Sequence, residues 1–399
     1  MAGYALEDAA RRCGLGVEAL EQLVALGVVA PTGDDGFSEG DLRRVSLATS
    51  LGASGISLED LGAAIREGHV SLAFMDAPAF DRFVQHTDVT FRQMAERTGV
   101  AIEHLQAIRE LSGSVTPDPD ERMRDAELPI ATWLQTGMMA NPRPSAVLQM
   151  VRVQADGLRR IAETEAAWWR DEVIGPAAAG GTRTDEVLGA EFGDRMSELT
   201  EQALLSMYHL QQTKAWMGNL VDGVLAMLAE AGLHSRLERQ PAMCFLDIAG
   251  YTQLTQERGD AAAAELADRL GAIVVRASTK YGGRPVKWLG DGVMIHFPEP
   301  APGVLAAIEM AENVSGAGLP PAHVGLHAGP VVFQEGDYYG STVILASRIA
   351  DYARPDEVVV SQAVVDAAGS APVTFRPIGP VSLKGVTGTV DLHVAVRST

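Results

Sequence analysis

The chain has 399 residues, a length that accommodates two or three domains. Its 52 acidic residues outnumber its 32 Lys and Arg residues, and the formal net charge of −20 argues against a general nucleic-acid binder. No apolar run approaches the roughly 20 residues that span a bilayer, and the start does not resemble a signal peptide, so a cytoplasmic protein without a transmembrane segment is expected. The two cysteines, Cys13 and Cys244, fall in different predicted domains, which disfavours a disulfide framework.

The first predicted domain, residues 1–70, alternates short helical patterns with turns. A helix break is expected at Gly14, a small wing or hairpin from Pro31, and a helix N-cap at Ser57. The segment resembles the N-terminal half of MerR-type winged helix-turn-helix domains. Residues 1–66 nevertheless contain five Arg, no Lys and ten acidic residues, whereas a DNA reader needs basic groups for phosphate contacts. A structural or dimerisation role is therefore favoured over DNA binding, and no nucleic-acid partner is expected.

A pattern in this first domain recurs further along the chain. Ala9–Gly27 matches Met94–Gly113, with glycine at Gly14 and Gly99 of the two copies. The match indicates either an internal duplication of a helix-turn-helix unit or a chance similarity between two amphipathic helices.

The second predicted domain, residues 71–208, has an almost wholly helical pattern. It is rich in apolar residues and Met, which suits either an adaptable lipid pocket or an ordinary bundle core, and the bundle core is the simpler interpretation. Three helices are expected: Glu127–Met139, a helix from an N-cap at Ser145 to about Val173, and, after a loop, Asp185–Glu230 as one helix or a kinked pair.

Residues 209–239 are predicted to form a connecting helix and a linker. Apolar residues from Trp216 to Leu228 recur at the spacing of a helix–helix seam. His209 and His234 flank this helix, and histidine is the side chain whose charge changes near neutral pH. We hypothesise that their protonation shifts the connecting helix. An unchanged pH–activity profile after substitution of both by Gln would contradict this hypothesis.

The stretch Phe245–Thr252, FLDIAGYT, carries the first chemical signal. An apolar run enters it like a buried strand, Asp247 ends the strand, and Gly250 provides a tight turn before a helical pattern that starts at Tyr251 and Thr252. A carboxylate at a strand end can hold Mg²⁺, and the free N–H groups of a helix start can hold phosphate oxygens. The stretch therefore predicts a site for a metal-bound polyphosphate, although a strand that ends in a solvated Asp has the same local pattern.

Further motifs follow in order along the chain. Lys287 and Asp291 lie four residues apart across a Gly-Asp-Gly turn, which predicts a hairpin with an acid at its tip. Asp337 precedes Tyr-Tyr-Gly, Arg348 ends an Ala-Ser-Arg run, and Lys384 lies in SLKGV. Together with FLDIAGYT, this order of motifs resembles the class III nucleotide cyclases over the C-terminal part of the chain. Several ordered motifs are far more specific than any one of them.

The local pattern and the resemblance agree on the fold of residues 240–399. They predict an α+β domain with a mixed or antiparallel sheet and helices on one side, like the ferredoxin-like core of class III cyclases, after an all-α N-terminal region of MerR-like winged helix plus helical bundle. The expected strands are Ala242–Asp247, Arg284–Lys287, Gly292–Phe297, Ala322–His327 and Glu357–Val360, and the expected helices are Asp260–Tyr281, Gly303–Val314 and Gly340–Tyr352.

The resemblance implies an adenylate cyclase, a phosphorus–oxygen lyase that converts ATP to 3′,5′-cyclic AMP and pyrophosphate. It implies that Asp247, Asp291 and the Ile248 carbonyl hold two Mg²⁺ or Mn²⁺ ions; without a cation, two convergent acids would repel each other. Lys287 and Asp337 occupy the purine-selecting positions, where a carboxylate and an ammonium complement the edge of adenine.

The same resemblance assigns the remaining site residues. Arg348 occupies the position of the transition-state arginine, and Lys384 that of a phosphate-contacting lysine. The N–H groups near Gly250–Thr252 would take the terminal phosphates. In this family one protomer supplies the metal acids and the other supplies the base-reading and transition-state residues, which implies a homodimer.

One position departs from the family pattern. Ile344 stands where the family has an asparagine that orients the ribose, and an isoleucine side chain donates no hydrogen bond. Loss of one positioned transition-state donor typically lowers kcat about 10²–10³-fold. The expected protein is thus an active but weakened cyclase. The alternatives are a pseudocyclase that binds nucleotide or lipid and, less favoured, a MerR-like DNA-binding regulator.

The order of a MerR-like start, a helical block, a connecting helix and a cyclase unit resembles the actinobacterial adenylate cyclases with an N-terminal autoregulatory domain. Members of that group respond to pH and can bind fatty acid. The resemblance implies regulation of this kind here, with a fatty acid or other lipid as a candidate partner of the helical domain.

Overall fold

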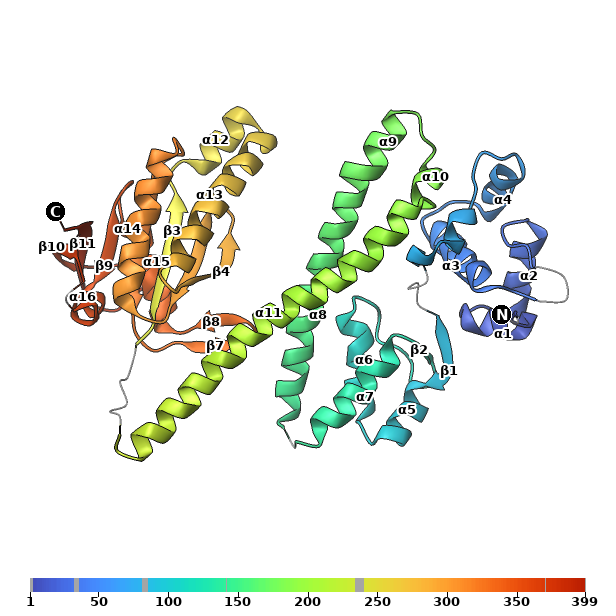
Figure 1. Ribbon diagram of the computed structural model, residues 1–399, viewed down its shortest axis with the longest axis horizontal. Helices are drawn as coiled ribbons and strands as arrows, with labels where there is room; N and C mark the ends of the chain where they lie inside the picture. The colour runs from blue at the N-terminus through green and yellow to red at the C-terminus, as the bar shows by residue number, and fades with distance from the viewer. Residues whose placement is uncertain are drawn as a thin grey trace. The chain divides into compact units, whose positions relative to one another are not determined.

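The structure, a computed structural model, divides into two compact units, Met1–Val224 and Leu225–Thr399, and the chain passes from one to the other within the long helix α11, Glu191–Glu230 (Figure 1). It describes residues 3–31, 36–80, 85–140, 142–233, 240–369 and 371–398, and for residues 144, 252–255 and 260 it describes the backbone alone. Within these ranges, no helix has both the length and the hydropathy needed to cross a bilayer.

The first part of the N-terminal unit consists of short helices and one isolated β-bridge. Gly14 takes a positive φ between α1 and α2, and the Ser57 side chain caps α4, so the predicted break and N-cap are confirmed. Tyr4 pairs with Phe37 where a wing was expected, but residues 32–35 lie outside the described residues, and the winged MerR-type fold remains a prediction. The elements are α1 Leu6–Arg12, α2 Val17–Ala25, α3 Glu39–Ala53, α4 Leu58–Arg66, and the 3₁₀ turns η2 Ala73–Asp76 and η3 Pro78–Phe80.

A second helix pair has a turn like that of the first. Helices α5 and α6 flank Gly99 with φ 70°, as α1 and α2 flank Gly14 with φ 68°. The matched residues Leu20 and Leu105 are both fully buried. The shared turn and core position agree with an internal duplication, which stays a prediction because a glycine with positive φ commonly ends a helix. The second pair comprises α5 Phe91–Thr98 and α6 Ile102–Leu111, with the antiparallel strands β1 His86–Thr90 and β2 Arg122–Arg124 beside it.

Arg109 of α6 forms a buried ion pair with Glu127, the first residue of α7 (Glu127–Met138). Its Nε and Nη2 atoms each donate to a Glu127 carboxylate oxygen at 2.8 Å, and Nη2 also donates to the Arg122 carbonyl at 2.9 Å. The guanidinium carbon lies 4.8 Å from the centroid of the Phe91 ring. Arg109 also pairs with Glu121, whose side chain is 46% exposed, so loss of Glu127 would leave the buried guanidinium with only a solvent-exposed charged partner.

We expect Glu127→Gln to lower the free energy of unfolding of this region by about 2–3 kcal/mol, because Arg109 keeps Glu121 as its one charged partner. Arg92→Gln is the matched control, because the Arg92–Asp120 pair lies in the same region but is exposed, and its loss is expected to have little effect. Urea denaturation of the full chain, followed by circular dichroism, measures both. Equally small effects of the two substitutions would contradict a structural role for the buried pair.

Two predictions for the helical region are wrong. Helix α8 begins after Arg143 with Pro144 in its first turn, so Ser145 lies inside the helix and does not cap it. Proline is favoured there because the first N–H groups of a helix have no partner within it. The segment expected to be a loop after Val173 begins with helix instead, whereas the kinked pair over Asp185–Glu230 is confirmed. This run consists of α8 Pro144–Trp168, the π-helical η4 Trp169–Ile174, α9 Gly175–Ala179, α10 Thr184–Leu188 and α11.

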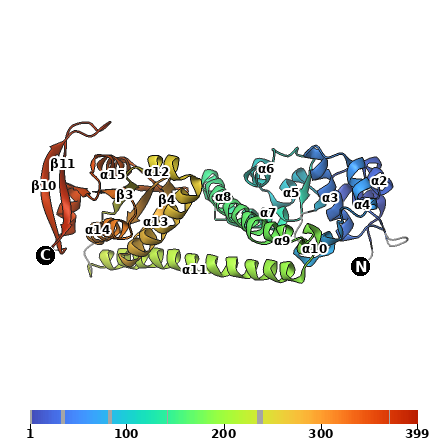
Figure 2. The same cartoon turned by 90° about the horizontal axis from the view of Figure 1, so that it is seen from above.

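A mixed sheet of seven described strands forms the centre of the second unit. The strand order is β10-β11-β9-β6-β3-β5-β4, and β6 and β9 are parallel whereas the other neighbours are antiparallel. Figure 2 shows β10 and β11 as a long ribbon at one edge of the sheet. The strands are β3 Ala242–Ile248, β4 Arg284–Leu289, β5 Gly292–Phe297, β6 Ala322–Ala328, β9 Val358–Ser361, β10 Val373–Val381 and β11 Val390–Arg397, and a separate hairpin comprises β7 Val332–Gln334 and β8 Asp337–Tyr339.

Helices cover both faces of this sheet, so the prediction of helices on one side is wrong. Along β3, Cys244 and Leu246 face a core shared with α13, α14 and α16, whereas Met243 faces α15, because successive side chains of a strand point to opposite faces. Gly325 of β6 lets α15 approach closely, since a Cβ there would lie 2.1 Å from the Ala350 nitrogen. The helices are α12 Tyr251–Arg258, α13 Asp260–Lys280, α14 Pro300–Gly316, α15 Ser341–Tyr352 and α16 Gln362–Ala368.

Candidate active site

Asp247 lies near the end of β3, on the sheet face that α15 covers. Its carboxylate packs against Gly292 of the neighbouring strand β5, where a Cβ would come within 3.0 Å of Asp247 Oδ1. Asp247 and Gly292 are register partners, so Asp291, the residue before Gly292, lies beside this carboxylate. The structure therefore brings the two predicted metal acids together, and glycine at position 292 leaves room for them.

The two carboxylates carry the same charge and repel each other. Burial raises the pKa of Asp247 above its ordinary value, and the charge of Asp291 raises it further. A divalent cation would remove this repulsion, and carboxylate oxygens are ligands that Mg²⁺ prefers. Over the described ranges, no three His, Cys, Asp or Glu side chains already form a metal-binding group, so backbone or substrate oxygens would have to complete the coordination. The Ile248 side chain is buried in the core, and a hydrogen bond from its backbone opposes the rise in the pKa of Asp247.

Asp291 owes its position to a tight hairpin. Leu289 of β4 pairs with Gly292 of β5, so Gly290 and Asp291 form a two-residue loop, and Gly290 has φ 74°. In such hairpins the first loop residue has a positive φ and is usually glycine. The predicted hairpin with an acid at its tip is therefore present.

His323 is a neighbour of Asp247 that the motifs did not identify. It is the register partner of Asp247 on β6, and its Nε2 lies 3.5 Å from Asp247 Oδ2. Its Nδ1 lies 2.8 Å from the Ala350 carbonyl, to which it must donate because a carbonyl only accepts. His323 opposes the rise in the pKa of Asp247. Only the order of the strands reveals this contact, because β3 and β6 are far apart in the sequence.

The two predicted purine-reading residues also lie together. Lys287 of β4 and Asp337 of β8 form an ion pair although 50 residues separate them. The second carboxylate oxygen, Asp337 Oδ1, accepts a hydrogen bond from the backbone N–H of Tyr338 at 2.7 Å. A carboxylate and an ammonium thus stand side by side, as recognition of an adenine edge requires.

Helix α15 presents Ile344 and Arg348 one turn apart on the same face. The Ile344 side chain is 57% exposed. Arg348 Nη1 donates to Asp351 Oδ2 at 2.8 Å, and the charge of Asp351 contributes to the raised pKa of Asp247. This end of α15 therefore lies near Asp247.

The predicted phosphate-binding residues lie at two other places in the unit. Lys384 is exposed in the turn between β10 and β11, and its neighbour Leu383 is buried against Ile349 of α15. Gly250 has φ 76°, and α12 begins at Tyr251 as predicted. The side chain of Thr252 lies outside the described residues.

The role of His209 and His234 as pH sensors remains a hypothesis. His209 is exposed on α11 beside Tyr208, with 5.9 Å between the ring centroids. His234 lies outside the described residues.

Known protein families match both parts of the chain. Residues 34–205 match the adenylate cyclase regulatory domain, and residues 235–395 match the adenylate and guanylate cyclase catalytic domain. The chain is 30% identical over 320 residues to a pH-sensitive adenylate cyclase of Mycobacterium tuberculosis, and the alignment covers 77% of each protein. The chain belongs to the class III adenylate cyclases of actinobacterial type.

Two further comparisons of this adenylate cyclase give lower identities. An adenylate cyclase of Streptomyces coelicolor is 24% identical, over 69% of this chain and 70% of the relative. The crystal structure of the adenylyl cyclase CyaB from P. aeruginosa aligns with 40% of this chain and 95% of its own at 23% identity, with a TM-score of 0.36. The adenylate cyclase described here thus has a helical regulatory domain followed by a catalytic domain with a mixed sheet.

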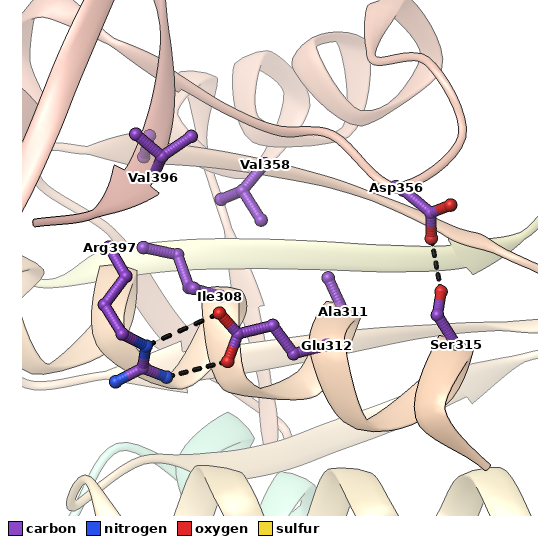
Figure 3. A pocket seen from close by; sticks show the side chains of 9 residues that line it. Ile308, Ala311, Glu312, Ser315, Asp356, Val358, Val396 and Arg397 are labelled. Atoms are coloured by element: carbon purple, nitrogen blue, oxygen red, sulfur yellow. Dashed lines mark hydrogen bonds and ion pairs between the residues drawn. The ribbon is translucent and has the colours of Figure 1, made fainter. Parts of the chain in front are cut away.

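The cyclase has a hollow in each unit, and neither is lined by a predicted catalytic residue. A groove of about 670 Å³ lies among α6, α7 and α8 of the regulatory unit, lined by apolar side chains that include Ile130, Trp133 and Leu158. A pocket of about 240 Å³ lies between α14 and the strands β9 and β11 of the catalytic unit (Figure 3). The ion pair of Arg397 with Glu312, at 2.9 Å, closes one side of the smaller pocket.

Proposed function

We propose that the protein converts ATP to 3′,5′-cyclic AMP and pyrophosphate at a site that two copies of the chain complete. The observation that carries this proposal is the meeting of Asp247 and Asp291 beside Gly292. Bound Mg²⁺ or Mn²⁺ would lower the pKa of the ribose 3′-hydroxyl and neutralise charge on the phosphates. The two carboxylates and the Ile248 carbonyl would hold these ions.

The side chains of the protein would bind and orient ATP. The Lys287 ammonium would donate to N1 of adenine, and the Asp337 carboxylate would accept from the N6 amino group. Arg348 would donate to the α-phosphate, while Lys384 and the N–H groups at the start of α12 would hold the terminal phosphates. In the free chain, the ion pairs Lys287–Asp337 and Arg348–Asp351 keep these charges compensated.

A homodimer is supported by the apolar surface around these residues. The hairpin strand β8 contacts both β4 and α15. Large exposed apolar side chains of this kind mark interaction surfaces. A symmetric contact between two copies would cover them and bring the base-reading pair of one copy to the metal acids of the other. The exposed apolar side chains on β4, the β7–β8 hairpin and α15 are Trp288, Leu289, Val332, Phe333, Tyr339 and Ile344. Those on α11 are Trp216, Met217, Leu220, Val221, Val224 and Leu228.

The N-terminal unit would regulate this activity. The groove among α6, α7 and α8 has the volume and apolar lining to accept part of a fatty-acid chain, and the relative from Mycobacterium tuberculosis is named pH-sensitive. Turnover would be measured across pH and with added oleate, for the full chain and for the chain without residues 1–234. Identical responses of the two proteins would contradict regulation by the N-terminal unit.

The purified chain is expected to form cyclic AMP from ATP and Mn²⁺, with a specific activity that rises with protein concentration as dimers form. Chromatographic separation of product from substrate measures the activity. A specific activity independent of concentration over the range in which sedimentation detects dissociation would contradict a shared site.

Ile344 favours a second candidate function, a pseudocyclase that binds nucleotide and signals by a change of conformation. Its exposed side chain cannot donate the hydrogen bond that orients the ribose. A pseudocyclase would bind ATP with a divalent cation yet form no cyclic AMP at any pH.

A further inference from the structure

A cluster of aromatic side chains lies directly behind the base-reading residue Asp337. Tyr338, the next residue, is only 8% exposed, and its ring stacks on His296 of β5 with 4.4 Å between centroids and 3° between planes. The Tyr338 hydroxyl accepts a hydrogen bond from Arg284 Nη2 of β4 at 2.9 Å. Phe333 of β7 packs on the same tyrosine ring, with centroids 5.1 Å apart. The cluster thus joins both strands of the small hairpin to two strands of the main sheet.

The hairpin needs such an attachment. Strands β7 and β8 have three residues each and form a two-stranded sheet of their own, and an isolated hairpin is at best marginally stable. Tyr338 is the buried residue of β8, whereas Asp337 is half-buried and Tyr339 is exposed. The position of Asp337 therefore depends on where the Tyr338 ring is held.

The imidazole of His296 is uncharged at neutral pH. Burial, assisted by the neighbouring charge of Arg284, lowers the pKa of His296 to about 4. The contact between His296 and Tyr338 is therefore a ring stack without an imidazolium charge, and stacked ring pairs contribute beyond the area they bury. The arginine supplies the polar partner that a buried tyrosine hydroxyl needs.

We propose that Tyr338, held by His296 and Arg284, positions Asp337 and thereby sets the preference for adenine over guanine. The inference rests on the proposed function, because it requires Lys287 and Asp337 to face the base. Adenine presents a donor at N6 and an acceptor at N1, whereas guanine presents the reverse. If the Asp337 carboxylate stays beside Lys287, its negative charge faces the O6 acceptor of guanine and disfavours that base. If the carboxylate moves away, this discrimination is lost.

Tyr338→Phe tests the proposal with a minimal change, because it keeps the ring stack and removes only the acceptor of the Arg284 hydrogen bond. We expect the ratio of kcat/KM for ATP to kcat/KM for GTP to fall about three- to tenfold, the usual effect of one hydrogen bond. KM for ATP should rise while kcat changes less, since base contacts are made equally in ground and transition states. Tyr339→Phe, which removes a hydroxyl from the exposed neighbour on the same strand, should leave the ratio unchanged.

A structural role alone predicts a different pattern. Loss of folded or dimeric enzyme would lower kcat and leave KM and the ATP-to-GTP ratio as they are. That result, or an equal change of the ratio in Tyr339→Phe, would overturn the proposal. Arg284→Gln should reproduce the Tyr338→Phe ratio, and the double variant should show no further loss, because both substitutions remove the same hydrogen bond.

Equilibrium binding distinguishes failure of this inference from failure of the proposed function. 3′-Deoxy-ATP and 3′-deoxy-GTP cannot be cyclised, so their competition with a fluorescent ATP analogue on the full chain with Mn²⁺ measures discrimination without turnover. A wild-type chain that prefers 3′-deoxy-ATP but forms no cyclic AMP would refute the cyclase activity. In that case, a reduced preference in Tyr338→Phe would still support the inference about Tyr338. An unchanged preference in Tyr338→Phe would overturn that inference. A wild-type chain that forms cyclic AMP but shows no preference in either assay would overturn the inference and leave the cyclase activity standing.

Discussion

Asp247→Asn is expected to lower cyclic AMP formation by at least about 10³-fold, because an amide supplies neither the charge nor the second anionic oxygen that a divalent cation requires. Metal stabilisation of the transition state amounts to several kcal/mol, and each 1.4 kcal/mol is a factor of about ten in rate. Asparagine has nearly the shape of aspartate, so the packing against Gly292 should survive. The measurement is the initial rate with ATP and Mn²⁺ at saturating concentrations of both.

Thermal unfolding provides a second readout that does not depend on turnover. Without metal, the substitution removes the repulsion between Asp247 and Asp291 and should not lower the unfolding temperature of the catalytic unit. With Mn²⁺, the wild-type unfolding temperature should rise because the folded state binds the ion, and the variant should show little rise. Asp366→Asn, an exposed acid on α16, is the matched control and should behave as wild type. A full metal-dependent rise in Asp247→Asn would contradict its assignment as a ligand.

Ile344→Asn is expected to raise kcat for ATP about 10²–10³-fold, since it restores one positioned donor in the transition state. The side chain is 57% exposed on α15, so a polar residue can replace it without leaving a cavity. Arg348, one turn away on the same face, would then act beside the new amide on the ribose and α-phosphate. KM should change much less than kcat, because the restored contact acts mainly in the transition state.

Ile344→Ala separates hydrogen bonding from bulk, because it removes most of the side chain without adding a donor. We expect no gain in kcat from alanine. An equal gain in both variants would show that the isoleucine obstructs the substrate and that the missing donor is unimportant. A wild-type rate that asparagine does not improve would mean that another group already supplies the hydrogen bond, and the absence of product in all three proteins would favour the pseudocyclase.

Much of the catalytic fold could be predicted from local sequence. Strand β3 reads as an apolar run because both of its faces are buried, and β5 and the long helices α13 and α14 have unmistakable periodicity. Strand β10 was missed because it contains Pro377, Gly379 and Pro380, which usually interrupt a strand. Its place at the edge of the sheet and a bulge between Pro377 and Gly379 accommodate them, since an edge strand does not need every N–H.

The sheet has helices on both faces for a reason that the sequence does not display. Helix α15 packs on β6 over Gly325, and a glycine inside a strand pattern also suits a bulge or a turn. Which helix fills this space depends on the path of the chain from β6 through α15 to β9. Tertiary topology decides this packing, and local periodicity carries no information about it.

The sequence by itself determined the chemistry available to this adenylate cyclase: the acids at Asp247 and Asp291, the Lys287–Asp337 pair, and the isoleucine in place of a donor at position 344. The hairpin that carries Asp291 was also predictable, because turn geometry is local. Only the tertiary structure decided that His323 stands beside Asp247 and that Tyr338 stacks on His296. Those contacts follow from strand order and register, which are set by long-range pairing and by the burial of both faces of the sheet.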